Sequence, residues 1–187
     1  RRYRKAFDAL VLAGLPLAVG AAVVGRDLIS FVAGAEFADA GWLLAVLMIA
    51  AACVFVAAVS CHAIVAVGMQ KPMIWMYAID AVVSLALYLA YVPERGAGAA
   101  AWITVFSEAF ILVVATVAVA RHTGIKPPIR STGWAIIGSA VMFAALGALA
   151  SLQVLLRIAI GAAIYGAAVL AIAPELRAIV RQLLGRH

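Results

Sequence analysis

The sequence predicts an all-α integral membrane protein, and two observations support this: its composition and its succession of long apolar runs. Of the 187 residues, 68% are hydrophobic and 12% are charged, and the mean hydropathy is +1.17. A soluble domain carries about 25% charged residues, so this chain has too few to cover a water-facing surface. Its apolar runs reach the length of about 20 residues that a helix needs to cross a bilayer. A soluble globular fold is therefore excluded.

Charged and turn-forming residues divide the chain into six predicted spans, which together form a six-transmembrane-helix bundle. A basic cytoplasmic lead-in covers residues 1–7, and a cytoplasmic amphipathic tail covers residues 174–187. The tail places apolar residues on one helical face and arginines on another, which predicts a short helix at the lipid interface. The six-helix transmembrane lobe covers residues 8–173, with spans at about 8–26, 40–66, 72–92, 97–120, 133–151 and 154–173.

The positions of the basic residues predict the topology. With a cytoplasmic N-terminus, eleven of the 14 Lys and Arg residues fall on the cytoplasmic side, and only Arg26, Arg95 and Arg157 fall on the other. Because cytoplasmic segments are enriched in Lys and Arg, we expect both termini to be cytoplasmic in a multi-pass protein of the inner (plasma) membrane. The net charge of +6 predicts contact with lipid headgroups and not with nucleic acid. Since the chain begins with Arg1, we also expect sequence upstream of it.

Two acids lie deep inside the predicted spans. Asp80 is nine residues from Lys71, or about 13 Å along a helix, and Glu108 is thirteen residues from Arg121, or about 20 Å. Both therefore lie near the middle of a hydrocarbon core about 30 Å thick. An ionisable group there costs about 3 kcal/mol and marks a transport pathway, a proton site or a buried pair.

Polar side chains accompany these acids on two helical faces, because residues three and four positions apart share a face. The face on the third span holds Tyr77, Asp80, Ser84 and Tyr88, and the face on the fourth holds Thr104, Ser107 and Glu108. One interpretation is a cavity lining with an ion-coupling role. The other is a pair of protonated carboxyls hydrogen-bonded in a tight bundle.

Pro16 lies in the middle of the first span, where it is expected to bend the helix as a static kink or as a hinge.

Metal-binding motifs such as Cys-x-x-Cys and His-Glu-x-x-His are absent from the sequence, as are the Gly-x-Ser-x-Gly elbow and the Walker loop. We therefore predict no metal site, no cofactor and no enzymatic activity.

Several short motifs occur in a familiar order. They are Gly14-Leu15-Pro16, the segments 31–40 and 66–72, Pro93-Glu94-Arg95-Gly96, and then Ala99 to Thr104 with Ser107-Glu108. In this order they resemble the C-terminal half of the polysaccharide flippases, the Wzx-like O-antigen exporters of the multidrug/oligosaccharidyl-lipid/polysaccharide (MATE-like) superfamily. The resemblance covers about residues 7–124. Asp80 occupies a place where asparagine is common in that family.

The resemblance implies one lobe of a transporter with about twelve helices in two lobes, which open a central cavity alternately to either face. It also implies that a lipid-linked oligosaccharide is moved outward, coupled to protons or sodium. An anionic pyrophosphate needs Arg or Lys, and none lies at mid-membrane depth here. We therefore expect a missing N-terminal lobe to supply these cations, while Asp80 and Glu108 contribute to coupling.

Two alternatives remain open at this point. A multidrug-type antiporter for organic cations would suit acids without buried cations. A non-transporting scaffold of a glycan synthesis complex would place Asp80 and Glu108 face to face in a dry bundle.

Overall fold

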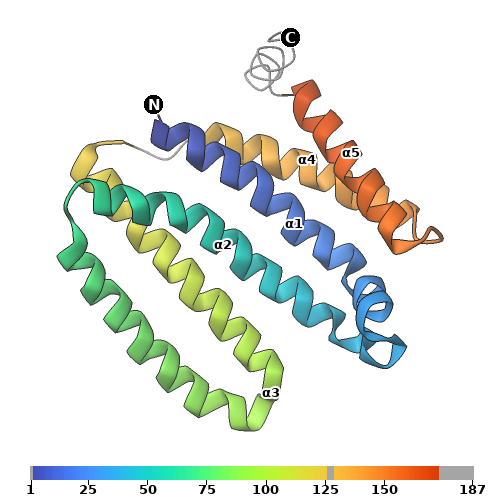
Figure 1. The fold of residues 1–187 in the computed structure, drawn as a ribbon, viewed down its shortest axis with the longest axis horizontal. Helices are drawn as coiled ribbons and strands as arrows, with labels where there is room; N and C mark the ends of the chain where they lie inside the picture. The colour runs from blue at the N-terminus through green and yellow to red at the C-terminus, as the bar shows by residue number, and fades with distance from the viewer. Residues whose placement is uncertain (1, 126–128, 173–187) are drawn as a thin grey trace.

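The computed structural model describes residues 2–125 and 129–172, which form helices joined by short connections (Figure 1). Five helices are long and apolar enough to cross a membrane, and the described residues include no strand. The all-helical class predicted from the sequence is therefore confirmed for the described residues, and the five long apolar helices fit a membrane protein. The helices are α1 Arg2–Ala33, η1 Ala35–Ala40, α2 Gly41–Ala66, α3 Gln70–Thr123, α4 Ile129–Ala148 and α5 Val154–Ile172.

Helix α3 has 54 residues and folds back on itself at Gly96, which has φ 61° and ψ −149°. That backbone conformation is accessible almost only to glycine, so Gly96 sets the position of the bend. The first arm (residues 70–95) and the second arm (residues 97–123) lie side by side and antiparallel (Figure 1). The predicted third and fourth spans fall on these arms. The six predicted spans thus correspond to five helices, and six membrane crossings stay a prediction.

The helices form a slab with the first arm of α3 at one edge and α5 at the other (Figure 1). Helix α1 lies inside the slab and contacts α2, α4 and α5. The second arm packs on α2 through buried apolar side chains, with Ala57 and Ile64 on α2 facing Ile111, Ala115 and Val119. The second arm therefore separates the first arm from α2 along most of its length.

Small residues allow α1 and α2 to approach closely, as is common for helices in lipid. A Cβ atom on Gly41 would overlap the backbone of Gly25 and Arg26, and a Cβ atom on Gly14 would lie 3.2 Å from the Cα of Ala52. Glycine at these positions fixes the contact between the two backbones.

Helix α1 extends to Ala33, several residues beyond the predicted span at 8–26. Its charged residues have partners there, since Arg26 pairs with Asp39 and Asp27 pairs with Arg157. Because these charged side chains are paired, the helix continues past them. The predicted amphipathic helix at residues 174–187 lies outside the described residues.

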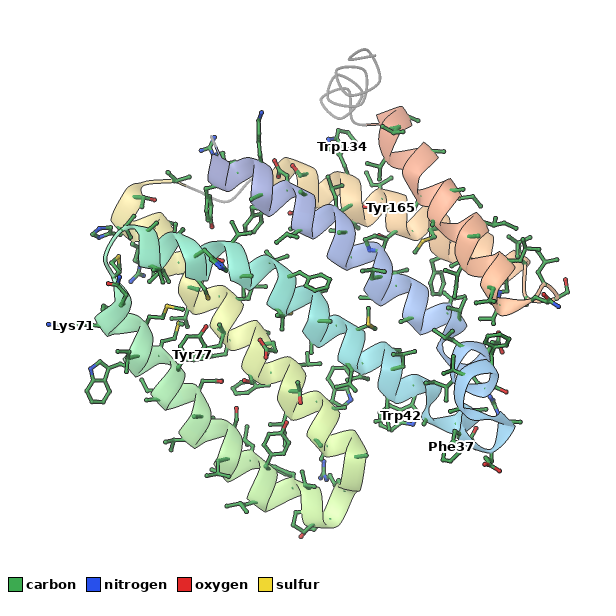
Figure 2. The ribbon with its side chains drawn as sticks, in the orientation of Figure 1. Phe37, Trp42, Lys71, Tyr77, Trp134 and Tyr165 are labelled. Carbon is green, nitrogen blue, oxygen red and sulfur yellow. The ribbon has the colours of Figure 1, made fainter. Side chains whose placement is uncertain are left out.

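Large apolar side chains cover much of the surface, and those of Ile74, Trp75, Val82 and Leu89 on the first arm are exposed. Such a surface suits lipid, where apolar exposure carries no hydrophobic cost. The first turn of α1, the turn between α2 and α3 near Lys71, and the C-terminal end of α3 gather at one end of the slab (Figures 1 and 2). The membrane side of this end stays a prediction.

Candidate functional site

The two polar faces predicted from the sequence meet between the arms of α3. We call this contact the polar seam, and it consists of Tyr77, Asp80, Ser84 and Tyr88 on the first arm and Thr104, Ser107 and Glu108 on the second. The bend at Gly96 brings the faces together because it reverses the chain direction. Tyr88 and Thr104, for example, are each eight residues from Gly96 and form a hydrogen bond.

Asp80 lies at the centre of the polar seam and receives one hydrogen bond. The Ser107 hydroxyl donates to its Oδ2 atom at 2.7 Å. Its Oδ1 atom is buried and has no hydrogen-bond partner among the described residues, and the same is true of the Ser84 hydroxyl one turn later. Buried polar atoms without partners are costly, so these two oxygens are available to a ligand.

Glu108 lies half-buried between the first arm and α2. It precedes buried Ile111 by three residues and buried Ala115 by seven, so it shares their helical face. Its carboxylate interacts electrostatically with Asp80, and also with Tyr77 and with Cys53 of α2. Two carboxylates repel each other when both are ionised, so a proton or a cation bound here lowers the electrostatic energy.

Two tyrosines flank the acids. Towards the bend, the Tyr88 and Thr104 hydroxyls lie 2.8 Å apart, and Thr104 also donates to the carbonyl of Ala100 at 3.0 Å. Towards α2, the Tyr77 hydroxyl lies 3.5 Å from the sulfur of Cys61, and Figure 2 shows Tyr77 between the two arms. The structure therefore links six of the seven predicted residues across the seam, and the seventh, Ser84, is buried one turn from Asp80.

Pro16, the predicted hinge, lies about 60 residues before the seam inside α1, and the helix continues across it. Its role as a hinge stays a prediction. Within the described chain, no group of three or more His, Cys, Asp or Glu residues could hold a metal ion.

A groove of about 600 Å³ lies beside the seam, between α1, α2 and the second arm. Its lining is almost entirely apolar, with Leu15, Ile49 and Leu112 among its residues, and it reaches Cys53 and Thr116. Neither Asp80 nor Glu108 belongs to this lining. The seam and the groove are therefore two separate sites, which lie next to each other because the second arm borders both.

Two polar contacts lie outside the sequence-based prediction. Ser60 is 0% exposed and joins three helices, since its hydroxyl lies 2.9 Å from the Tyr3 hydroxyl and 3.1 Å from that of Thr116. In the sequence, Ser60 lies three residues after Ala57 and four before Ile64. This helical spacing places it on the same face of α2 as these two residues, which the structure buries.

The second contact, the α1–α5 joint, is the ion pair of Asp27 with Arg157. Arg157 is only 3% exposed, and its Nη2 atom also donates to the carbonyl of Leu146 at 3.3 Å. These residues are 130 positions apart, so no local spacing could reveal the pair.

Comparison with protein-family models, with curated proteins and with solved structures found no match to this chain.

Proposed function

We propose that this chain is one lobe of an ion-coupled membrane transporter in which the polar seam binds the coupling ion. One observation carries the proposal: Asp80 has a buried oxygen with no partner among the described residues, inside a hairpin of long apolar helices. A carboxyl group near the middle of a bilayer costs about 2.5–3.5 kcal/mol. Within the described residues its one hydrogen bond comes from a hydroxyl and not from a cation. Binding of a proton or sodium would offset that cost.

The proposed cargo is a lipid-linked oligosaccharide, moved outward by alternating access between this lobe and a second, N-terminal one. The motif order supports this cargo, and the apolar groove beside α1 suits its lipid portion. Among the described residues, the groove lining contains no Lys or Arg, so the second lobe would supply the cations that bind a pyrophosphate. The proposal places about six crossings in this lobe, both termini in the cytoplasm and the protein in the inner membrane.

A multidrug-type antiporter is the second candidate, and it is favoured by a groove lining that, in the described part of the chain, includes no basic residue. An organic cation needs apolar walls and a nearby acid, and Glu108 interacts electrostatically with Cys53, which lines this groove. The two candidates differ in the second lobe, where buried arginines would favour the glycan lipid and further acids would favour a drug cation.

A non-transporting scaffold is the third candidate. It is favoured by the direct bond between Ser107 and Asp80 and by the absence of both acids from the groove lining. A scaffold would need neither an ion gradient nor a moving helix.

Gradient-driven transport tests the proposal. The complete polypeptide that carries this chain is reconstituted in liposomes with a proton or sodium gradient, and uptake of a fluorescent lipid-linked oligosaccharide is compared with uptake of an organic cation. We expect Asp80→Asn and Glu108→Gln to lose the stimulation by the gradient. Glu94→Gln is the matched control, since Glu94 is an exposed acid next to the bend, and it should behave as wild type.

Three results bear on the candidates. Gradient dependence that is unchanged in both amide variants contradicts coupling at the seam. Stimulated uptake of the organic cation alone selects the antiporter. Transport of neither cargo selects the scaffold.

A further inference from the structure

Pro16 leaves one carbonyl of α1 without its helical donor. In an α-helix the N–H of each residue bonds the carbonyl four positions earlier, and proline has no N–H, so the carbonyl of Leu12 loses its partner. A carbonyl left unsatisfied in a lipid environment is costly, and neighbouring helices can supply the missing donor.

Tyr165 of α5 supplies this donor. Its hydroxyl donates to the oxygen of Leu12 at 2.7 Å, across 153 positions of sequence. This cross-helix bond takes the place of the bond that Pro16 removes. Helix α1 is continuous through Pro16 while the bond is present.

Gly138 of α4 makes room for the tyrosine ring. A Cβ atom on Gly138 would lie 3.1 Å from Cε2 of Tyr165 and 2.8 Å from Cγ2 of Val169. Both distances are shorter than ordinary contacts, so a side chain here would displace the ring. The position of the hydroxyl therefore depends on α4 as well as on α5.

There is open space beside this contact. A groove of about 520 Å³ is lined by Pro16, Leu17, Met142 and Ile158 among others, and Tyr165 also belongs to its lining. The side of α1 that carries Pro16 is thus not fully packed.

We propose that Tyr165 is a latch that keeps α1 continuous across Pro16, and that breaking its bond to Leu12 lets the two halves of α1 pivot at Pro16. The apolar groove beside the seam is lined by Phe7, Val11 and Leu15 before the proline and by Ala18 and Val19 after it. A pivot would therefore change the shape of that groove. The inference does not rest on the proposed function, because it concerns the helix and not the cargo.

Distance measurements between two spin labels test the latch in the complete polypeptide. Labels are attached at exposed Lys5 of α1 and exposed Ile74 of the first arm, in a background in which Cys53 and Cys61 are replaced by serine. At this end Tyr3 of α1 and Met73 of the first arm pack against the same apolar cluster as α2, so two helix spacings of 8–10 Å predict a distance of about 16–20 Å. Labelled wild-type protein should give a narrow distribution, and Tyr165→Phe should give a broader one.

Pro16→Ala provides the decisive second background. Alanine restores the N–H that bonds Leu12, so Tyr165→Phe should leave the distribution narrow when combined with Pro16→Ala. Tyr91→Phe is the matched control, because it removes the hydroxyl of an exposed tyrosine near the bend of α3, and it should also leave the distribution narrow.

A Tyr165→Phe distribution as narrow as that of wild type would overturn the inference. The inference would also be overturned if Tyr165→Phe still broadened the distribution when combined with Pro16→Ala, since that broadening would come from lost packing and not from a pivot at Pro16. Both results are independent of whether the seam couples transport to an ion.

Discussion

The polar seam and the α1–α5 joint each hold a carboxylate on an apolar helix, but their partners differ. At the joint, Asp27 faces the guanidinium of Arg157, which is buried and also bonds the carbonyl of Leu146. At the seam, Asp80 faces the hydroxyl of Ser107 and has one buried oxygen with no partner in the described part of the chain. Arg157 Nε at the joint also lacks a partner there, but the Asp27 carboxylate has a cation beside it. The described residues offer Asp80 a hydroxyl and no cation. A structural role therefore suits Asp27, and a binding role suits Asp80.

This difference predicts opposite effects on stability when each carboxylate is replaced by an amide. Removing one partner of a buried ion pair costs about 3–5 kcal/mol, because the other charge stays buried and unpaired. Removing an uncompensated carboxyl from mid-membrane depth relieves a cost of about 2.5–3.5 kcal/mol. The substitutions below test this contrast in order of decreasing expected loss.

Asp27→Asn should cause the largest loss, about 3 kcal/mol in the free energy of unfolding in mixed micelles, because Arg157 then lacks its counter-charge. Arg157→Met should cost less, since the side chain of Asp27 is 53% exposed and can be solvated when alone. Asp39→Asn is the control. It breaks the pair with Arg26, whose side chains are 73% and 91% exposed, and should cost about 0–1 kcal/mol. Equal losses for Asp27→Asn and Asp39→Asn would contradict this, since the buried pair at the joint would then stabilise the protein no more than the exposed pair of Arg26 with Asp39.

Gly41→Ala should destabilise the same end of α1 by about 1–3 kcal/mol, because the added Cβ would meet the backbone of Arg26 and only a shift of a whole helix relieves the overlap. Thermal unfolding measures the loss. Gly147→Ala is the control, since a Cβ there meets no atom within 4 Å, and it should be neutral or slightly stabilising. If Gly41→Ala unfolded at the wild-type temperature, the close contact between α1 and α2 would not be needed for stability.

Ser107→Ala should lower the free energy of unfolding by about 0.6 kcal/mol, the average for a hydrogen bond between membrane helices. The same substitution should have a smaller effect in an Asp80→Asn background, where no charged acceptor is left. A double-mutant cycle measures this difference. Additive losses would mean that Ser107 stabilises the hairpin independently of Asp80, and that the seam is a structural contact.

The fold class and the polar faces could be predicted from the sequence because they depend on local properties. Apolar runs define helices that can cross a membrane, and spacings of three and four residues place Asp80 and Ser84 on one face. The contact between Asp80 and Ser107 also depends on the bend at Gly96, for which the sequence offers Pro93 and Gly96 as turn residues. The sequence does not distinguish this bend from an ordinary turn. It indicates neither the left-handed conformation of Gly96 nor the continuation of α3 on both sides of it.

The remaining contacts could not be predicted, because the helices are apolar on nearly every side. In a water-soluble helix the polar side indicates the surface, but in lipid both the packed and the exposed sides are apolar. Ser60 is buried while the side chain of Ile74 is exposed, the reverse of the order that hydropathy suggests. The bonds from Arg157 to Asp27 and from Tyr165 to Leu12 join residues 130 and 153 positions apart, beyond any local pattern.

The unfolding of Asp80→Asn tests the central claim most directly, because asparagine keeps an acceptor for the Ser107 hydroxyl and removes only the charge. The claim is that the Asp80 carboxylate is kept for binding and not for stability. The account predicts a thermal midpoint in detergent equal to that of wild type or higher, beside a clear decrease for Asp27→Asn. A midpoint that falls for Asp80→Asn as far as it does for Asp27→Asn would contradict it, since both carboxylates would then be structural.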